Sequence, residues 1–147
     1  MEVRIAAGEP YALRLNMDKA AKTIPEGLSW TELGPGHANT INADFHAWGD
    51  VVIARKETPT SYHLSVVVDD ALQGVTHVVR GMDLFEQTTI HRLLQTLLDL
   101  PEPLYFHHRL ITGDDGGKLA KSASSLPLHE MRGHGVTAPQ IRRMLGF

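Results

Sequence analysis

The sequence has 147 residues, of which 42% are hydrophobic and 21% are charged, and its net charge is -3. A chain of this length is the size of one domain and buries about two thirds of its unfolded surface, so we expect a folded protein rather than a disordered or fibrous one. The absence of cysteine excludes disulfides and thiolate zinc sites. No apolar run approaches the ~18 residues of a spanning helix and no export signal is visible, so we expect a cytoplasmic protein without a membrane partner.

The first 60 residues are expected to hold two strands separated by a long connection. Residues 11–17 alternate in polarity and residues 51–54 are mostly β-branched, which predicts two strands that can pair. Residues 22–45 are rich in Gly, Pro, Asn and Thr, which predicts an irregular connection between them. An irregular segment this long in a compact domain is usually functional or mobile.

After residue 60 the pattern changes to that of a parallel sheet. Residues 62–72 fit a buried strand by their three valines and a helix by their apolar spacing, and periodicity alone leaves both open. Residues 76–80 predict a strand, residues 88–100 an amphipathic helix and residues 104–111 another strand. Strand, helix, strand is the βαβ unit of a parallel sheet, so the predicted fold class is α/β.

The end of the chain is expected to form two short helices with a basic surface. One helix is predicted to begin near Pro127, and the other after Thr137, which has capping-box spacing to Gln140. Residues 118–147 carry five Lys and Arg residues against one acid, Glu130. Such a segment either contacts a polyanion or is ordinary solvated surface.

A candidate ligand site lies where the two later strands end. Ligands of parallel sheets bind beyond the carboxyl ends of the strands, and both Arg80 and the loop 112–118 follow such ends. The glycines of this loop let it close over a ligand, and Lys118 and Lys121 supply compact positive charge for phosphates. The loop is not a P-loop, because Leu119 stands where Ser or Thr would follow the lysine. From these residues alone, it is either a phosphate loop or a solvated turn.

Several segments together resemble one enzyme family. Lys118-Leu-Ala-Lys-Ser122 is similar to the KMSKS signature of class I aminoacyl-tRNA synthetases. Upstream segments match the glutamyl group in order and spacing, namely residues 8–15, 49–53, 62–70 and 74–83. The chain therefore resembles the C-terminal half of the catalytic core of a glutamate-activating class I synthetase.

Two features indicate the branch of this family. Gly81-Met-Asp-Leu84 stands where glutamyl-tRNA synthetases commonly have Gly-Glu-Asp-His, and nothing like an anticodon-binding domain follows Phe147. Both favour the glutamyl-queuosine tRNA(Asp) synthetase branch. The resemblance implies that residues 61–147 form the second half of a Rossmann-type nucleotide-binding domain with the KMSKS-like loop. It also implies that residues 1–60 form the distal part of an inserted domain that contacts the tRNA acceptor.

The resemblance also implies roles for individual residues. Tyr62 and Arg80 fall on the residues that contact glutamate, and Lys121 on the lysine that meets the ATP phosphates and acts in catalysis. The implied ATP-binding loop is Lys118, Leu119, Ala120, Lys121 and Ser122. It departs from the signature at Ala120, which lacks the usual hydroxyl. By position alone, packing is the commoner role of a residue such as Tyr62, and a surface ion pair, with Asp69, Asp70 or Asp83, is the commoner role of Arg80.

The implied activity is that of an ATP-dependent ligase. It would form glutamyl-adenylate and transfer glutamate to queuosine in the anticodon of tRNA(Asp), using ATP with Mg²⁺ and L-glutamate. The His-Ile-Gly-His-like signature and the family's zinc segment are absent from these 147 residues, so we expect the chain alone not to catalyse adenylation. The alternatives are part of an ordinary glutamyl-tRNA synthetase, with tRNA(Glu) as partner, and a non-catalytic nucleotide- or RNA-binding module.

The nine histidines do not predict a metal site. His107 and His108 are adjacent on a predicted strand, so their side chains point to opposite faces and do not easily share a metal. His129 and His134 imitate a zincin helix, but their spacing takes the second histidine off the shared face. We therefore interpret the spacing of His129 and His134 as coincidence and expect core or surface packing for His107 and His108.

Overall fold

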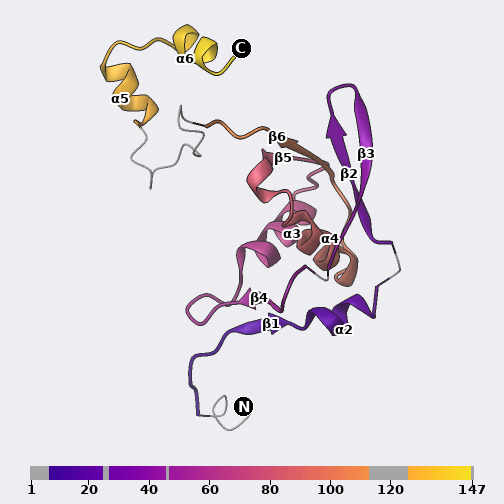
Figure 1. Cartoon of the computed structure of the whole chain (residues 1–147). Helices are drawn as coiled ribbons and strands as arrows, with labels where there is room; N and C mark the ends of the chain where they lie inside the picture. The colour runs from indigo at the N-terminus through magenta and orange to yellow at the C-terminus, as the bar shows by residue number, and fades with distance from the viewer. Residues whose placement is uncertain (1–6, 25–26, 46, 113–125, 147) are drawn as a thin grey trace. The chain divides into compact units, whose positions relative to one another are not determined.

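A computed structural model describes residues 7–24, 27–45, 47–112 and 126–146 (Figure 1). The chain forms two compact units, Met1–His108 and Arg109–Phe147. The assignment of residues 1–60 to an inserted domain and of residues 61–147 to the nucleotide-binding domain stays a prediction.

The first unit begins with a short two-stranded ribbon and a helix. Strand β1 (Leu13–Leu15) pairs antiparallel with β4 (Val51–Ala54), which confirms the predicted pair. The strand predicted at 11–17 is too long, because helix α2 (Met17–Ala21) begins within it. The side chain of Asn16 caps this helix by accepting a hydrogen bond from the backbone N–H of Lys19 at 2.8 Å.

The prediction of an irregular connection over residues 22–45 is wrong. Strands β2 (Ser29–Gly34) and β3 (His37–Asn42) form an antiparallel hairpin in this segment. Its two-residue turn contains Gly36 at a φ of +80°, a conformation that glycine adopts without strain. The glycine and proline that indicated a loop therefore mark only the turn, and the hairpin projects from the unit in Figure 1.

The main sheet contains the predicted βαβ unit. Strands β5 (His77–Gly81) and β6 (Leu104–His108) are parallel, and helix α4 (Thr88–Leu97) connects them. A single turn of 3-10 helix (Met82–Leu84) precedes α4. Strand β2 pairs parallel with the other side of β6, so the strand order is β3-β2-β6-β5. The hairpin is thus part of the same sheet as the candidate site.

Two predicted elements are shorter than expected. Helix α4 ends at Leu97, rather than at residue 100, and Asp99 just beyond it adopts a φ of 53°, which is incompatible with continuing the helix. Strand β6 ends at His108 rather than at residue 111. Boundaries are where local sequence signals are weakest.

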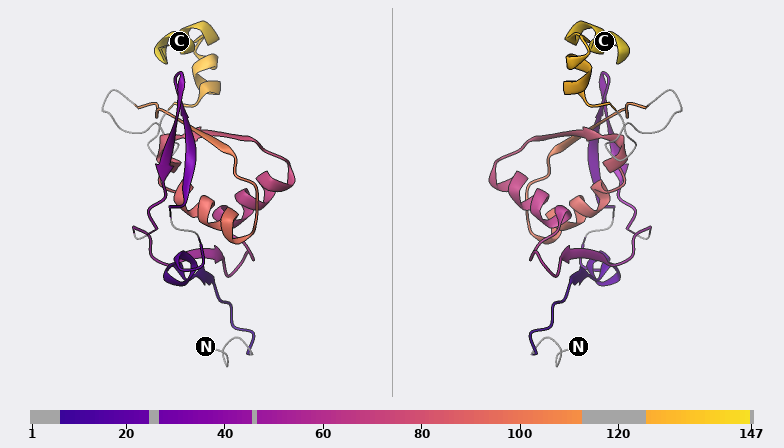
Figure 2. Two further views of the ribbon diagram at one scale, coloured as in Figure 1. Left: turned by 90° about the vertical axis from the view of Figure 1, so that its right-hand side faces the viewer. Right: turned by 90° about the vertical axis from the view of Figure 1, so that its left-hand side faces the viewer.

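Residues 62–72, for which strand and helix were both open, form helix α3 (Tyr62–Leu72). The side chain of Ser61 caps it, at 3.4 Å from the backbone N of Leu64. Figures 1 and 2 show α3 and α4 between the ribbon and the main sheet. The core lies there and consists of Met17, Ala20, Val51, Val67, Ile90, Leu93 and Leu94.

The second unit consists of two short helices, as predicted. Helix α5 (Leu128–Gly133) follows Pro127, and helix α6 (Ala138–Met144) follows Thr137. The backbone N–H of Thr137 donates to Oε1 of Gln140 at 2.7 Å, which confirms the capping box. Among the described ranges of both units, the helices are too short or too polar to cross a membrane.

Candidate functional site

Arg80 lies near the carboxyl end of β5 and is held by three neutral acceptors. Its Nε donates to Nε2 of His107 at 2.9 Å, its Nη1 to Nδ1 of His91 at 3.0 Å, and its Nη2 to Oγ1 of Thr88 at 2.7 Å. The guanidinium carbon also lies 5.4 Å from the ring centroid of Tyr105. These neutral acceptors fix the plane of the guanidinium without neutralising its positive charge.

His107 connects Arg80 to a buried carboxylate. Glu32 on β2 accepts the backbone N–H of His107 at 2.7 Å with Oε1, and its Oε2 lies 2.8 Å from Nδ1 of His107. Nε2 of His107 accepts from Arg80, and Nδ1 carries the proton of the neutral ring toward the carboxylate of Glu32, so the two partners together define the tautomer. Burial lowers the pKa of His107, while the hydrogen bond to Glu32 raises it.

A second chain of imidazoles extends from Arg80 to helix α3. Because Arg80 donates to Nδ1 of His91, the proton of His91 lies on Nε2 and points to Nδ1 of His63, 3.0 Å away. Burial lowers the pKa of His91 to about 3, and Arg80, His63 and His107 act in the same direction. Burial and Arg80 also lower the pKa of His63. The two rings are therefore neutral at neutral pH.

The structure brings the two residues predicted to contact glutamate to the same imidazole. Tyr62 is the first residue of α3, and the residue is 47% exposed. Its ring packs edge-on against His91, with the centroids 5.7 Å apart, and against His63 at 5.6 Å. His91 thus contacts both Tyr62 and Arg80, although these residues lie on different elements. A cation and an exposed phenol beside one ring suit an anionic ligand.

Asp70, one of the alternative partners of Arg80, lies close enough for the charge of Arg80 to affect its pKa. Burial raises the pKa of Asp70, and Arg80 opposes that change. The direct hydrogen bonds of Arg80 go to His107, His91 and Thr88. Arg80 is therefore oriented by neutral groups and only modulated by this carboxylate.

The predicted ATP-binding residues Lys118, Leu119, Ala120, Lys121 and Ser122 lie outside the described residues. Strand β6 is the strand that precedes this loop in the chain. Their implied roles stay predictions.

Sequence reasoning missed most of the groups around Arg80. Glu32 lies on the same buried face of β2 as Trp30, two residues away, but this spacing indicates nothing in a segment whose composition predicts a loop. Thr88 and His91 lie three residues apart on α4 and are buried on the same helix. The packing role predicted for His107 is confirmed, since it is buried while His108 is exposed.

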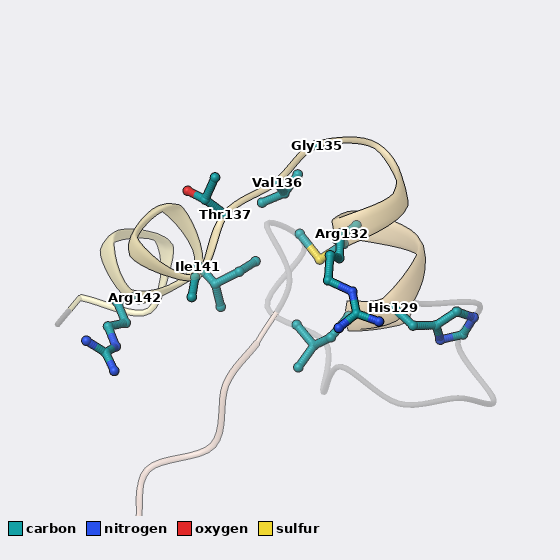
Figure 3. A pocket seen from close by; sticks show the side chains of 10 residues that line it. His129, Arg132, Gly135, Val136, Thr137, Ile141 and Arg142 are labelled. Carbon is teal, nitrogen blue, oxygen red and sulfur yellow. The ribbon is translucent and has the colours of Figure 1, made fainter.

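The described part of the second unit carries a cavity of about 670 Å³ between its helices (Figure 3). Val136 and Ile141 lie between α5 and α6, and Arg132 and Arg142 lie at the margin. The lining is largely apolar with cationic residues at the edge. The polyanion contact predicted for this basic segment stays a prediction.

The side chains of the described residues are not clustered as metal ligands are. No group of three or more histidine, aspartate or glutamate side chains in these ranges is arranged to hold a metal ion. The imidazoles around Arg80 are instead linked to one another by hydrogen bonds.

Comparison with known proteins defines the family. Residues 1–146 match the family of class I tRNA synthetases (E and Q), catalytic domain, and the chain belongs to this family. It is 50% identical over 142 residues to a glutamyl-Q tRNA(Asp) synthetase of Rhodobacter capsulatus, covering 92% of this chain and 49% of the relative. It is 37% identical over 142 residues to the protein of the same name from Nocardia farcinica, covering 97% of this chain and 42% of the relative.

Solved structures support the fold. A glutamate-tRNA synthetase from Elizabethkingia anophelis superposes with a TM-score of 0.59 at 22% identity, covering 82% of this chain and 23% of that chain. The predicted α/β fold class and the resemblance to glutamate-activating class I synthetases are confirmed. The chain spans about half the length of the curated relatives it matches.

Proposed function

We propose that this chain supplies part of the catalytic core of an ATP-dependent ligase that activates glutamate and transfers it to queuosine in the anticodon of tRNA(Asp). Membership of the family and 50% identity to a glutamyl-Q tRNA(Asp) synthetase support this reaction. The observation that carries it is the oriented cation Arg80 beside the half-exposed Tyr62. We expect it to act in the cytoplasm.

Arg80 suits a carboxylate ligand. It already uses one N–H on each of its three nitrogens, so at most one further N–H on each Nη nitrogen is left for a ligand. Two such donors match the two oxygens of a glutamate carboxylate. The hydroxyl of Tyr62 adds a neutral donor that helps to distinguish glutamate from other amino acids.

The activation step needs positive charge beside ATP. A carboxylate oxygen of glutamate attacks the α-phosphorus, the bond to the bridging oxygen breaks, and pyrophosphate leaves. We propose that Lys121 stabilises the charge that develops on the phosphates, with Lys118 and Ser122 shaping the loop. Mg²⁺ accompanies the ATP phosphates.

The reaction is tested with the chain joined to the first half of the Rhodobacter capsulatus relative's catalytic core. We expect ATP–pyrophosphate exchange that requires glutamate but no tRNA, followed by transfer of glutamate to queuosine-containing tRNA(Asp). Transfer to tRNA(Glu) instead would identify an ordinary glutamyl-tRNA synthetase. Absence of glutamate-dependent exchange in a folded protein would contradict the proposal and favour a binding module.

The role of Arg80 is tested in the same protein. Arg80→Ala should lower kcat/KM for glutamate roughly 10- to 100-fold per lost charge-assisted hydrogen bond, with the KM for ATP little changed. Arg14→Lys, at an exposed residue of β1, is the matched control and should leave both constants unchanged. An unchanged glutamate KM in Arg80→Ala would show that Arg80 is a structural cation.

A further inference from the structure

Glu32 is a buried carboxylate that makes two of its three hydrogen bonds with His107, which in turn contacts Arg80. Only 9% of the residue is exposed, and it lies on β2, in the hairpin. Besides its two hydrogen bonds with His107, it accepts one from Nε1 of Trp30 at 3.3 Å. A buried charge is costly unless it is paired or hydrogen-bonded, so this carboxylate is held in one position.

The position of Glu32 determines where the proton of His107 lies. A carboxylate can only accept, so it keeps the proton on Nδ1 and leaves Nε2 as the acceptor for Nε of Arg80. With the proton on Nε2, two donors would face each other 2.9 Å apart and the guanidinium would have to turn away. The hydroxyl of Thr88 gives no such control, because it rotates and accepts in either case.

We propose that Glu32 is a positioning residue that fixes the guanidinium of Arg80 for its ligand by setting the tautomer of His107. The ligand is a carboxylate of glutamate, and this part of the inference rests on the proposed function. We call the three residues Glu32, His107 and Arg80 the relay. They lie on β2, β6 and β5, which are neighbouring strands of the sheet.

Glu32→Gln tests the relay with little change of shape. The backbone N–H of His107 cannot turn, so the amide oxygen must face it and the amide NH₂ must face Nδ1. The ring of His107 then lies between two donors, and because no carboxylate holds the proton on Nδ1, we expect it to move to Nε2, where it opposes Arg80. In the completed enzyme, we expect the KM for glutamate to rise about 10- to 100-fold, as for a reacting group displaced by about 1 Å. The KM for ATP should stay within about twofold of wild type.

Glu102→Gln is the matched control. Glu102 pairs with Arg92 at 2.8 Å rather than with Glu32, His107 or Arg80. This variant should keep the wild-type KM for glutamate. A KM that is unchanged in Glu32→Gln, or raised equally in Glu102→Gln, would overturn the inference.

Changes at His107 separate the relay from a purely structural effect. His107→Gln places an oxygen near the Nε2 position, so Arg80 keeps an acceptor that needs no tautomer, whereas His107→Leu removes the acceptor. We expect His107→Leu to reproduce the loss of glutamate affinity and His107→Gln to lose less. In the His107→Gln background, Glu32→Gln should cost less than about a third of its effect in wild type. Equal costs in both backgrounds would show that Glu32 acts independently of His107.

The tautomer can be read without any enzyme assay. In the 147-residue chain, ¹⁵N NMR of the His107 ring should show a protonated Nδ1 in wild type and a protonated Nε2 in Glu32→Gln, with a shifted Arg80 Nε signal. An unchanged ring proton would overturn the relay even if the enzyme activates glutamate. Failure of glutamate activation together with the tautomer change would instead overturn only the proposed function.

Discussion

At the residue scale, the buried imidazoles around Arg80 make stability depend on pH. The pKa of His91 is about 3 in the folded protein and about 6.5 when unfolded. Between these values the unfolded chain binds a proton that the folded one does not, so stability rises with pH. The slope for this residue is at most about 1.4 kcal/mol per pH unit. Stability is fully present above about pH 6.5 and is lost as the pH falls toward 3.

This prediction is checked by urea unfolding at pH 7.5 and 5.5. His63 and His107, whose pKa values are also lowered, add to the same trend. His91→Asn is the matched variant, because its amide oxygen takes the place of Nδ1 as acceptor and does not titrate. Its unfolding free energy should depend less on pH than that of wild type. An equal pH dependence would show that His91 is not the titrating group.

The predicted strand end indicated Arg80, and the family resemblance indicated Tyr62 and the ligand of both, but neither signal indicated the residues that support them. Glu32 and His107 are 75 residues apart, and no local pattern reports which distant side chain a buried residue will meet. Periodicity assigns a residue to a face of its element. It does not assign a partner on another strand, and the tautomers follow only from the complete set of partners.

At the element scale, helix α4 carries the core on one face. Leu93 is 0% exposed and belongs to the core cluster, whereas Leu97 on the last turn is 37% exposed. Leu93→Ala should lower the free energy of unfolding by about 2–5 kcal/mol, through lost burial and a cavity. Leu97→Ala should cost clearly less, about 1 kcal/mol or below. Chemical denaturation of both variants measures the difference, and similar costs would place the core elsewhere.

Elements with strong local signals were predicted, and those shaped by distant contacts were not. The residues within each segment are enough to predict helix α4 and the capping box of α6. Helix α3 was ambiguous because its valines favour a strand, and it is settled by its cap at Ser61 and by burial of Val67 against the core. The β2–β3 hairpin is not predicted, because Gly, Pro, Asn and Thr are spread through residues 22–45 and indicate a loop there.

At the scale of the molecule, strand β5 lies at an edge of the main sheet. Among the described residues it pairs only with β6, and Val79 on it is 66% exposed. An open edge with an apolar side chain favours pairing between copies. Val79→Lys should therefore reduce self-association of the 147-residue chain, as measured by sedimentation velocity over a range of concentrations. Lys19→Arg, on α2, is the control and should not change it.

The α/β class was predictable from the strand, helix, strand order, but the strand order was not. Strand β2 lies beside β6, far along the chain, and this pairing depends on contacts that neither segment specifies by itself. The candidate site depends on the same pairing, because Glu32 comes from β2. Glu32 could therefore not be predicted as part of the site, because its position depends on the pairing of β2 with β6.

The hairpin contributes none of the seven residues of the core cluster, yet it supplies the carboxylate behind Arg80. A chain in which β2 had separated from β6 would lose the burial of Trp30 and would hold Arg80 without a defined orientation. By mass action, a ligand that binds only the oriented cation would in turn favour the docked hairpin. Affinity for that ligand therefore also reports whether β2 is paired with β6.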